Sequence, residues 1–136
     1  MPTLTRWFIK SAMLYLVAAL ALSVAMQSPL ADTMPVLRRI WPTYLHLLVV
    51  GWLTQLIFGV AFWMFPKYSA ARPRGSDQWG WATLALLNIG LVLRAIGEPW
   101  QGSVAGAAPL LVASAVAQLL AGLAFVVNTW PRVKER

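Results

Sequence analysis

Four long apolar runs, separated by short polar or basic segments, constrain the fold of this chain more than any other feature. Each run is long enough to cross the hydrocarbon core of a bilayer, which takes about 20 residues of α-helix. We expect helices at about residues 7–27, 43–65, 79–96 and 109–130. The sequence therefore predicts an all-α integral membrane protein, a four-helix bundle in a lipid bilayer.

The composition argues against an ordinary water-soluble domain. Hydrophobic residues make up 60% of the 136 residues and charged residues only 11%, whereas soluble domains contain about half and about a quarter. A chain of this length cannot bury four apolar runs in water, because a large share of a small domain's surface stays exposed. The length suits one domain, so we expect residues 1–136 to form a single transmembrane domain.

The first run also resembles a secretory signal peptide, since Arg6 and Lys10 precede it and Pro29 follows it. No clear small-x-small cleavage site follows the apolar part, as removal of a signal peptide would require. We therefore expect this run to remain as the first transmembrane helix.

Basic residues indicate the orientation, because cytoplasmic loops are enriched in lysine and arginine. Arg38, Arg39 and Arg94 lie on one side of the predicted helices. Eight basic residues lie on the other side: Arg6, Lys10, Lys67, Arg72, Arg74, Arg132, Lys134 and Arg136. We expect an N-in/C-in protein of a bacterial-type inner membrane. Nucleic-acid binding is not expected despite the net charge of +7, because the basic residues form no dense cluster with interleaved aromatic residues.

The chain contains no cysteine, so disulfides, thiolate metal sites, iron–sulfur clusters and cysteine nucleophiles are excluded. The acidic residues are expected at or beyond helix ends, which disfavours a transporter: Asp32, Asp77, Glu98 and Glu135. Three amides are expected at similar depth near the helix middles, where they would hydrogen-bond between helices: Gln55, Asn88 and Gln118.

The only histidine, His46, lies one turn inside the second predicted helix. An ionisable residue within a membrane is costly to bury and indicates a functional site. With an α-helical period, the face that carries His46 also carries Val50, Leu53, Ile57, Val60 and Met64. Nearly opposite, three residues recur every four positions and favour close approach of a neighbouring helix: Gly51, Gln55 and Gly59.

His46 has two interpretations. It could hydrogen-bond a carbonyl or lie near lipid headgroups, or it could bind a prosthetic group. Zinc and copper are disfavoured because further ligands are lacking or scattered, whereas haem iron accepts one histidine per chain. Haem propionates need cations, and Arg94, Arg38 and Arg39 lie on the same predicted side as His46. Arg94 could equally pair with Glu98 at i+4 or extend to the membrane interface.

The second predicted helix and its flanks also resemble a known family. The segment LHLLVVGWLTQLIFGVAFWMFPK, preceded by RWFIKSAMLYL and followed by LLNIGLVLRAIGEPW, is similar to the N-terminal helices of haem–copper oxidase catalytic subunits, especially the cbb3-type and nitric-oxide-reductase branches, and to NnrS-like haem proteins. The resemblance implies that His46 ligates a low-spin haem b near the outer side of the membrane. This chain lacks the family's second axial ligand and its copper and second-haem histidines, so the resemblance does not imply oxygen or nitric oxide reduction by this chain alone.

Two hypotheses follow. The first is a membrane b-type cytochrome with His46 as the metal ligand, acting in electron transfer with a respiratory-chain partner or in gas or haem sensing. Its second axial ligand would come from an identical subunit in a homodimer, from a methionine or from a partner subunit, or the site would be five-coordinate. The second hypothesis is a cofactor-free structural or accessory subunit of a membrane respiratory complex. We do not expect an enzyme in the chain by itself.

Overall fold

The computed structural model describes residues 1–133, and within that range the chain is helical without any strand. Four helical spans are long and apolar enough to cross a membrane: Thr3–Gln27, Trp41–Met64, Asp77–Trp100 and Ala107–Arg132. We call these the first to fourth spans. The all-α fold with four such helices is confirmed.

The spans consist of the following elements. The first is α1 (Thr3–Gln27), and the second joins α4 (Trp41–His46), the π-helix η1 (Leu47–Thr54) and α5 (Gln55–Met64). The third is α6 (Asp77–Gly97), extended by the 3₁₀ turn η2 (Glu98–Trp100), and the fourth is α7 (Ala107–Thr129), extended by η3 (Trp130–Arg132). Each span begins two to four residues earlier than expected from the apolar runs. The connector before the second span contains two short helices, α2 (Leu30–Thr33) and α3 (Val36–Arg39), each preceded by a proline.

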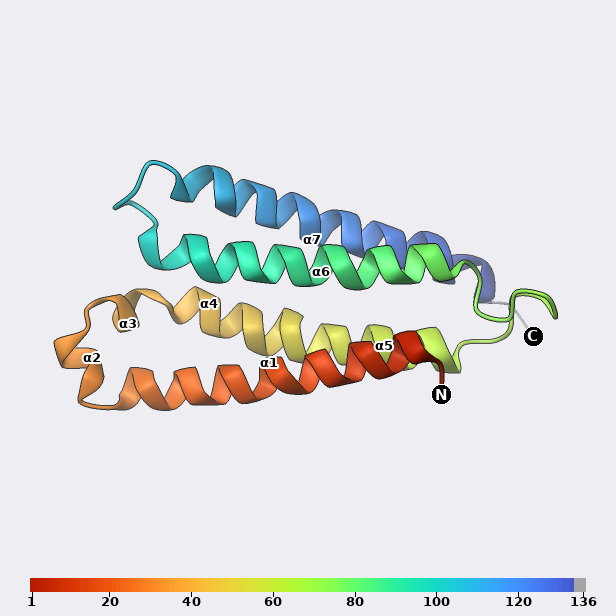
Figure 1. The fold of residues 1–136 in the computed structure, drawn as a ribbon, viewed down its shortest axis with the longest axis horizontal. Helices are drawn as coiled ribbons and strands as arrows, with labels where there is room; N and C mark the ends of the chain where they lie inside the picture. Colours follow the sequence, from red (N-terminus) through yellow and green to blue (C-terminus); the bar gives the residue numbers. More distant parts are fainter. Residues whose placement is uncertain (134–136) are drawn as a thin grey trace.

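The spans form two antiparallel hairpins. In Figure 1, α1 lies alongside the second span, and α6 lies alongside α7. The start of α1 and the end of η3 lie at one end of the molecule, together with the loop between α5 and α6. The α2–α3 connector and the α6–α7 loop lie at the other end. We call these the terminal end and the connector end.

Glycines on the second span allow α1 to pack closely. Gly51, Gln55 and Gly59 are all buried. A Cβ atom at Gly51 would lie 2.8 Å from Cγ of Tyr15, and one at Gly59 would lie 2.5 Å from Cβ of Phe8. Such distances leave no room for a side chain, so the predicted close approach of a neighbouring helix is confirmed, and that helix is α1.

The π-helix η1 corrects the predicted face of His46. Leu53, Ile57 and Met64 are exposed, whereas His46 is half-buried and contacts the third span. A π-helix has i→i+5 hydrogen bonds and therefore turns less per residue than an α-helix. The sequence prediction assumed an α-helical period across residues 47–54 and so grouped His46 with residues that point elsewhere.

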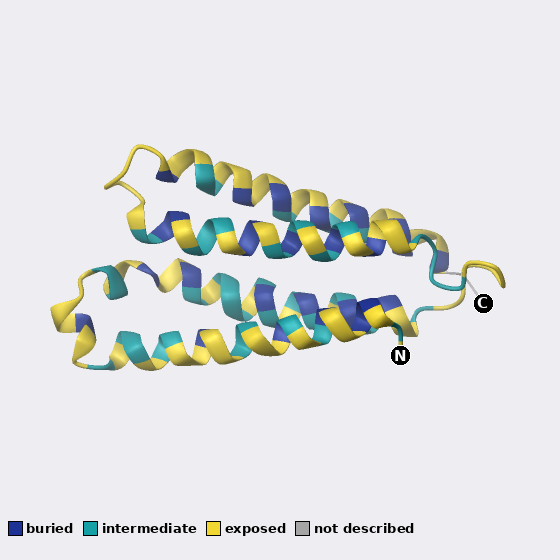
Figure 2. Cartoon of the chain, viewed as in Figure 1, coloured by how far each residue is buried: buried dark blue, intermediate teal, exposed yellow. Residues whose placement is uncertain are grey.

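Burial is distributed as a bilayer would require. Figure 2 shows buried residues where the helices face one another and exposed residues along the outer faces. Many large apolar side chains are on those outer faces, among them Leu14, Val17, Leu20, Ile89, Val92, Val112, Leu119 and Val126. A continuous apolar surface of this kind suits contact with lipid rather than water.

Candidate functional site at His46 and Glu98

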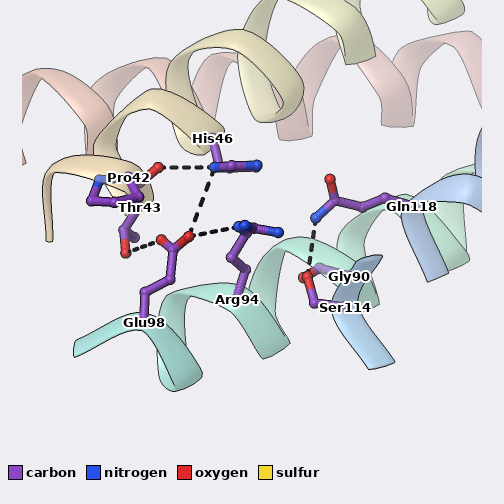
Figure 3. Close-up of polar contacts among 8 residues, drawn as sticks. All are labelled: Pro42, Thr43, His46, Gly90, Arg94, Glu98, Ser114 and Gln118. Carbon is purple, nitrogen blue, oxygen red and sulfur yellow. Dashed lines mark hydrogen bonds and ion pairs between the residues drawn. The ribbon is translucent and has the colours of Figure 1, made fainter. Parts of the chain in front are cut away.

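The candidate site lies near the connector end, between the second and third spans (Figure 3). His46 is the last residue of α4, and Thr43 lies one turn before it. Glu98 begins η2, and Arg94 lies one turn before it in α6. Because each pair is separated by about one helical turn, each span presents two polar side chains to the other.

The ring of His46 is held by the backbone of its own helix. Its Nδ1 atom lies 2.9 Å from the carbonyl oxygen of Pro42. A carbonyl oxygen can only accept a hydrogen bond, so Nδ1 must carry the proton and donate it. In the neutral ring Nε2 then has a free lone pair, and 29% of the side chain is exposed.

Glu98 is the centre of the polar cluster. Its Oε1 atom accepts a hydrogen bond from Nε of Arg94 at 2.6 Å, and its Oε2 atom accepts one from the hydroxyl of Thr43 at 2.6 Å. Oε1 also lies 3.9 Å from Nδ1 of His46. The side chain is only 3% exposed, and a carboxylate so deeply buried requires a counter-charge, which Arg94 supplies.

The predicted propionate partners have different surroundings. Arg94 is at the site, but it makes the i+4 pair with Glu98. Arg38 pairs with Asp32 at 2.6 Å, and Arg39 donates a hydrogen bond to Ser103 at 3.1 Å. The structure therefore brings Arg94 into the cluster with His46 and gives Arg38 and Arg39 partners outside it.

Sequence reasoning missed the roles of Glu98 and Thr43. The expected position of Glu98 at a helix end is confirmed, since it follows α6 and begins η2. Its burial between two spans was not predicted. Thr43 and Glu98 are 55 positions apart, so no local spacing could link them. The available signal was Arg94 at i−4, which marks Glu98 as a residue with a charged partner.

The three mid-helix amides do not bond to one another. Asn88 accepts a hydrogen bond from the hydroxyl of Tyr15 at 2.8 Å, which links the third span to α1. Gln118 donates to Ser114, whose hydroxyl donates to the carbonyl of Gly90 at 2.6 Å and links α7 to α6. Gln55 is fully buried, and neither of its side-chain polar atoms has a partner among residues 1–133.

The residues at the site fit one axial bond to a haem iron. The ring orientation is fixed at Nδ1, and Nε2 is left for a metal, which is the usual arrangement of a ligating histidine. A protein-only metal site is a poorer fit, since no group of three histidine or acidic side chains that could hold a metal occurs within the described part of the chain. The cation at the site is already paired, so a propionate would have to share Arg94 or recruit another arginine.

Fold and site define an all-helical protein with four helices suited to cross a membrane, which indicates a multi-pass membrane protein with a buried ionic cluster between two of its spans. No protein-family model, curated protein or solved structure matches the chain.

Proposed function

We propose that the protein is a membrane b-type cytochrome that binds haem b through Nε2 of His46. One observation carries this proposal: the Pro42 carbonyl holds Nδ1 of the ring, which leaves Nε2 as the available ligand atom. The role that fits such a site is electron transfer or sensing of a gas or of haem, because the chain has no second histidine for further metal chemistry. The resemblance to the haem–copper oxidase helices supports the same assignment.

The bound haem would supply a one-electron couple between ferric and ferrous iron. The protein's own contribution is to fix the ligand. The hydrogen bond to Pro42 selects the tautomer of His46 and limits rotation of the ring. The side chain is 29% exposed, so part of it can be reached by a group from outside the chain.

A second axial ligand is then expected from a second copy of the chain. The chain has a single histidine, and a two-fold dimer would bring two copies of His46 to opposite faces of one haem. Arg38 remains a propionate candidate because its pair with Asp32 is well exposed, and exposed ion pairs contribute little and exchange easily. Arg39 is a candidate for the same reason, since its bond to Ser103 is also at the surface.

The proposed location is the bacterial-type inner membrane, with both termini in the cytoplasm and the connector end outside. This orientation rests on the distribution of lysine and arginine, which is denser at the terminal end. It places His46 and Glu98 in the outer half of the bilayer. A redox partner would then approach the haem from the outer side.

Spectra of the purified protein test the proposal. We expect a b-type band in reduced-minus-oxidised spectra of protein in mild detergent, and we expect His46→Ala to abolish it because the iron loses its ligand. Tyr15→Phe is a matched control, since it removes a different interhelical hydrogen bond and should keep the band. A wild-type protein without the band, or a band that survives in His46→Ala, contradicts the assignment.

A cofactor-free accessory subunit of a respiratory complex is the second candidate. It is favoured by the polar cluster itself, because both carboxylate oxygens of Glu98 and Nδ1 of His46 have partners within the chain. The cluster could therefore serve only to join two spans. Isolation of the protein as a stoichiometric part of a larger complex, without haem of its own, would select this candidate.

A further inference from the structure

We propose that Glu98 is a positioning residue that lowers the reduction potential of a haem ligated by His46; this inference rests on the proposed function. Its basis is the 3.9 Å separation between Oε1 of Glu98 and Nδ1 of His46. Glu98 would act through the ring and would not itself touch the iron.

The carboxylate is held in one place. Arg94 donates to one oxygen and Thr43 to the other, both at 2.6 Å. These donors come from two different spans, so Glu98 can move toward or away from His46 only if a short, charge-assisted hydrogen bond is broken. A fixed charge at a fixed distance from the ring is what a tuning residue requires.

Burial makes this charge effective. The Glu98 side chain is 3% exposed, and charges removed from water interact much more strongly than charges at a protein surface. Oxidation of the iron adds one positive charge next to the imidazole, and a nearby carboxylate stabilises that state. This charge interaction favours ferric iron and lowers the potential.

The cation of Arg94 offsets part of this charge, but the group that lies 3.9 Å from Nδ1 is the carboxylate oxygen. Replacing Glu98 by glutamine therefore removes the negative charge nearest the ring and leaves the Arg94 cation unbalanced. Both changes disfavour ferric iron. A residue that only joined two helices would alter stability or haem content and leave the potential unchanged.

The test is a redox titration of the full-length, haem-loaded protein in detergent. We expect Glu98→Gln to change the reduction equilibrium constant about tenfold in favour of ferrous iron, which is a rise of about 59 mV for a one-electron couple. Asp77→Asn is the control, because it also removes one carboxylate charge, but Asp77 is exposed and begins α6 at the terminal end, away from His46. Its potential should stay close to that of the wild type.

A second variant covers the case in which Glu98→Gln does not fold. Glu98→Asp keeps the charge beside Arg94 but withdraws the carboxylate from the ring, so it should shift the potential in the same direction by a smaller amount. If the wild type binds haem and every folded Glu98 variant has the wild-type potential, the tuning role is overturned while the haem assignment stands. If the wild type binds no haem, both are overturned.

Discussion

At the residue scale, Arg132 shows how much a single side chain can contribute to joining the hairpins. It is fully buried, although its place next to the C-terminus suggested only a basic residue that sets orientation. Its guanidinium donates hydrogen bonds of 2.8 to 3.0 Å to the carbonyls of Phe62, Phe65 and Pro66. The last carbonyls of a helix lack partners within the helix, so Arg132, in η3, caps the end of the second span.

Loss of this cap should destabilise the protein. Arg132→Ala leaves three carbonyls without their donor and removes a cation that lies 5.7 Å from the ring centre of Phe62. Each unsatisfied buried group costs about 1–3 kcal/mol, and we expect a total loss of roughly 2–5 kcal/mol in unfolding measurements in detergent. Arg132→Lys should be intermediate, because lysine lacks the forked donor geometry.

Arg72→Ala is the control for this prediction, since Arg72 is an exposed arginine in the loop at the same end of the molecule. It should unfold like the wild type. Equal stability of the Arg132→Ala and Arg72→Ala proteins would show that the hydrogen bonds of Arg132 contribute nothing in the membrane-like environment.

The residue scale also shows where prediction from sequence ends. The position of His46 one turn inside an apolar run could be predicted from the sequence, because an apolar run is a local feature. The contact of His46 with Glu98 was not, because it depends on how two separate spans are rotated about their axes. Arg94 and Glu98 lie four residues apart, and their pairing was among the expected alternatives for that reason.

At the scale of elements, the packing face of the second span could be predicted from the sequence, whereas the direction of the face that carries His46 could not. The spacing of Gly51, Gln55 and Gly59 indicated a packing face, and that face meets α1. The π-helix that follows His46 could not be predicted, because such helices are rare and have no propensity signal. In an α-helix one turn takes about 3.6 residues, so residues four apart are displaced a little around the helix axis. The π-helix η1 takes more residues per turn and displaces them in the opposite direction. The packing face therefore stays directed at α1 from Gly51 to Gly59.

A pair of glycine substitutions tests this packing. Gly59→Ala should destabilise the protein by about 1–3 kcal/mol, because the new methyl group overlaps Phe8 and must separate the two helices. Gly122→Ala, the matched control on α7, meets no atom within 4 Å. It should be neutral or stabilise the protein by up to about 1 kcal/mol, since alanine favours a helix over glycine.

The comparison uses the same unfolding assay in detergent for both variants. The difference between them isolates packing, because the two substitutions are chemically identical and both lie in spans. If Gly59→Ala unfolds at the same denaturant concentration as Gly122→Ala, α1 does not pack against the second span as described.

At the scale of the whole molecule, the two hairpins are joined at three levels. Arg132 links the fourth span to the second at the terminal end, and Thr43 and Glu98 link the second to the third at the connector end. Between these ends, Tyr15 bonds to Asn88. The number of spans, and the position of the start of the first span and the end of the fourth at the same end of the molecule, followed from the four apolar runs. The links did not, because each joins residues from different spans.

The arrangement makes the orientation in the membrane directly testable, because the chain has no native cysteine. Gln101 lies in the α6–α7 loop at the connector end, and Ala70 lies in the α5–α6 loop at the terminal end; both are exposed. If the basic terminal end lies in the cytoplasm, as proposed, a membrane-impermeant thiol reagent added to intact spheroplasts should label Gln101→Cys. It should label Ala70→Cys only after the membrane is opened. Labelling of Ala70→Cys in intact spheroplasts, with Gln101→Cys protected, would reverse the orientation and place His46 in the cytoplasmic half of the bilayer, on the side opposite to the proposed redox partner.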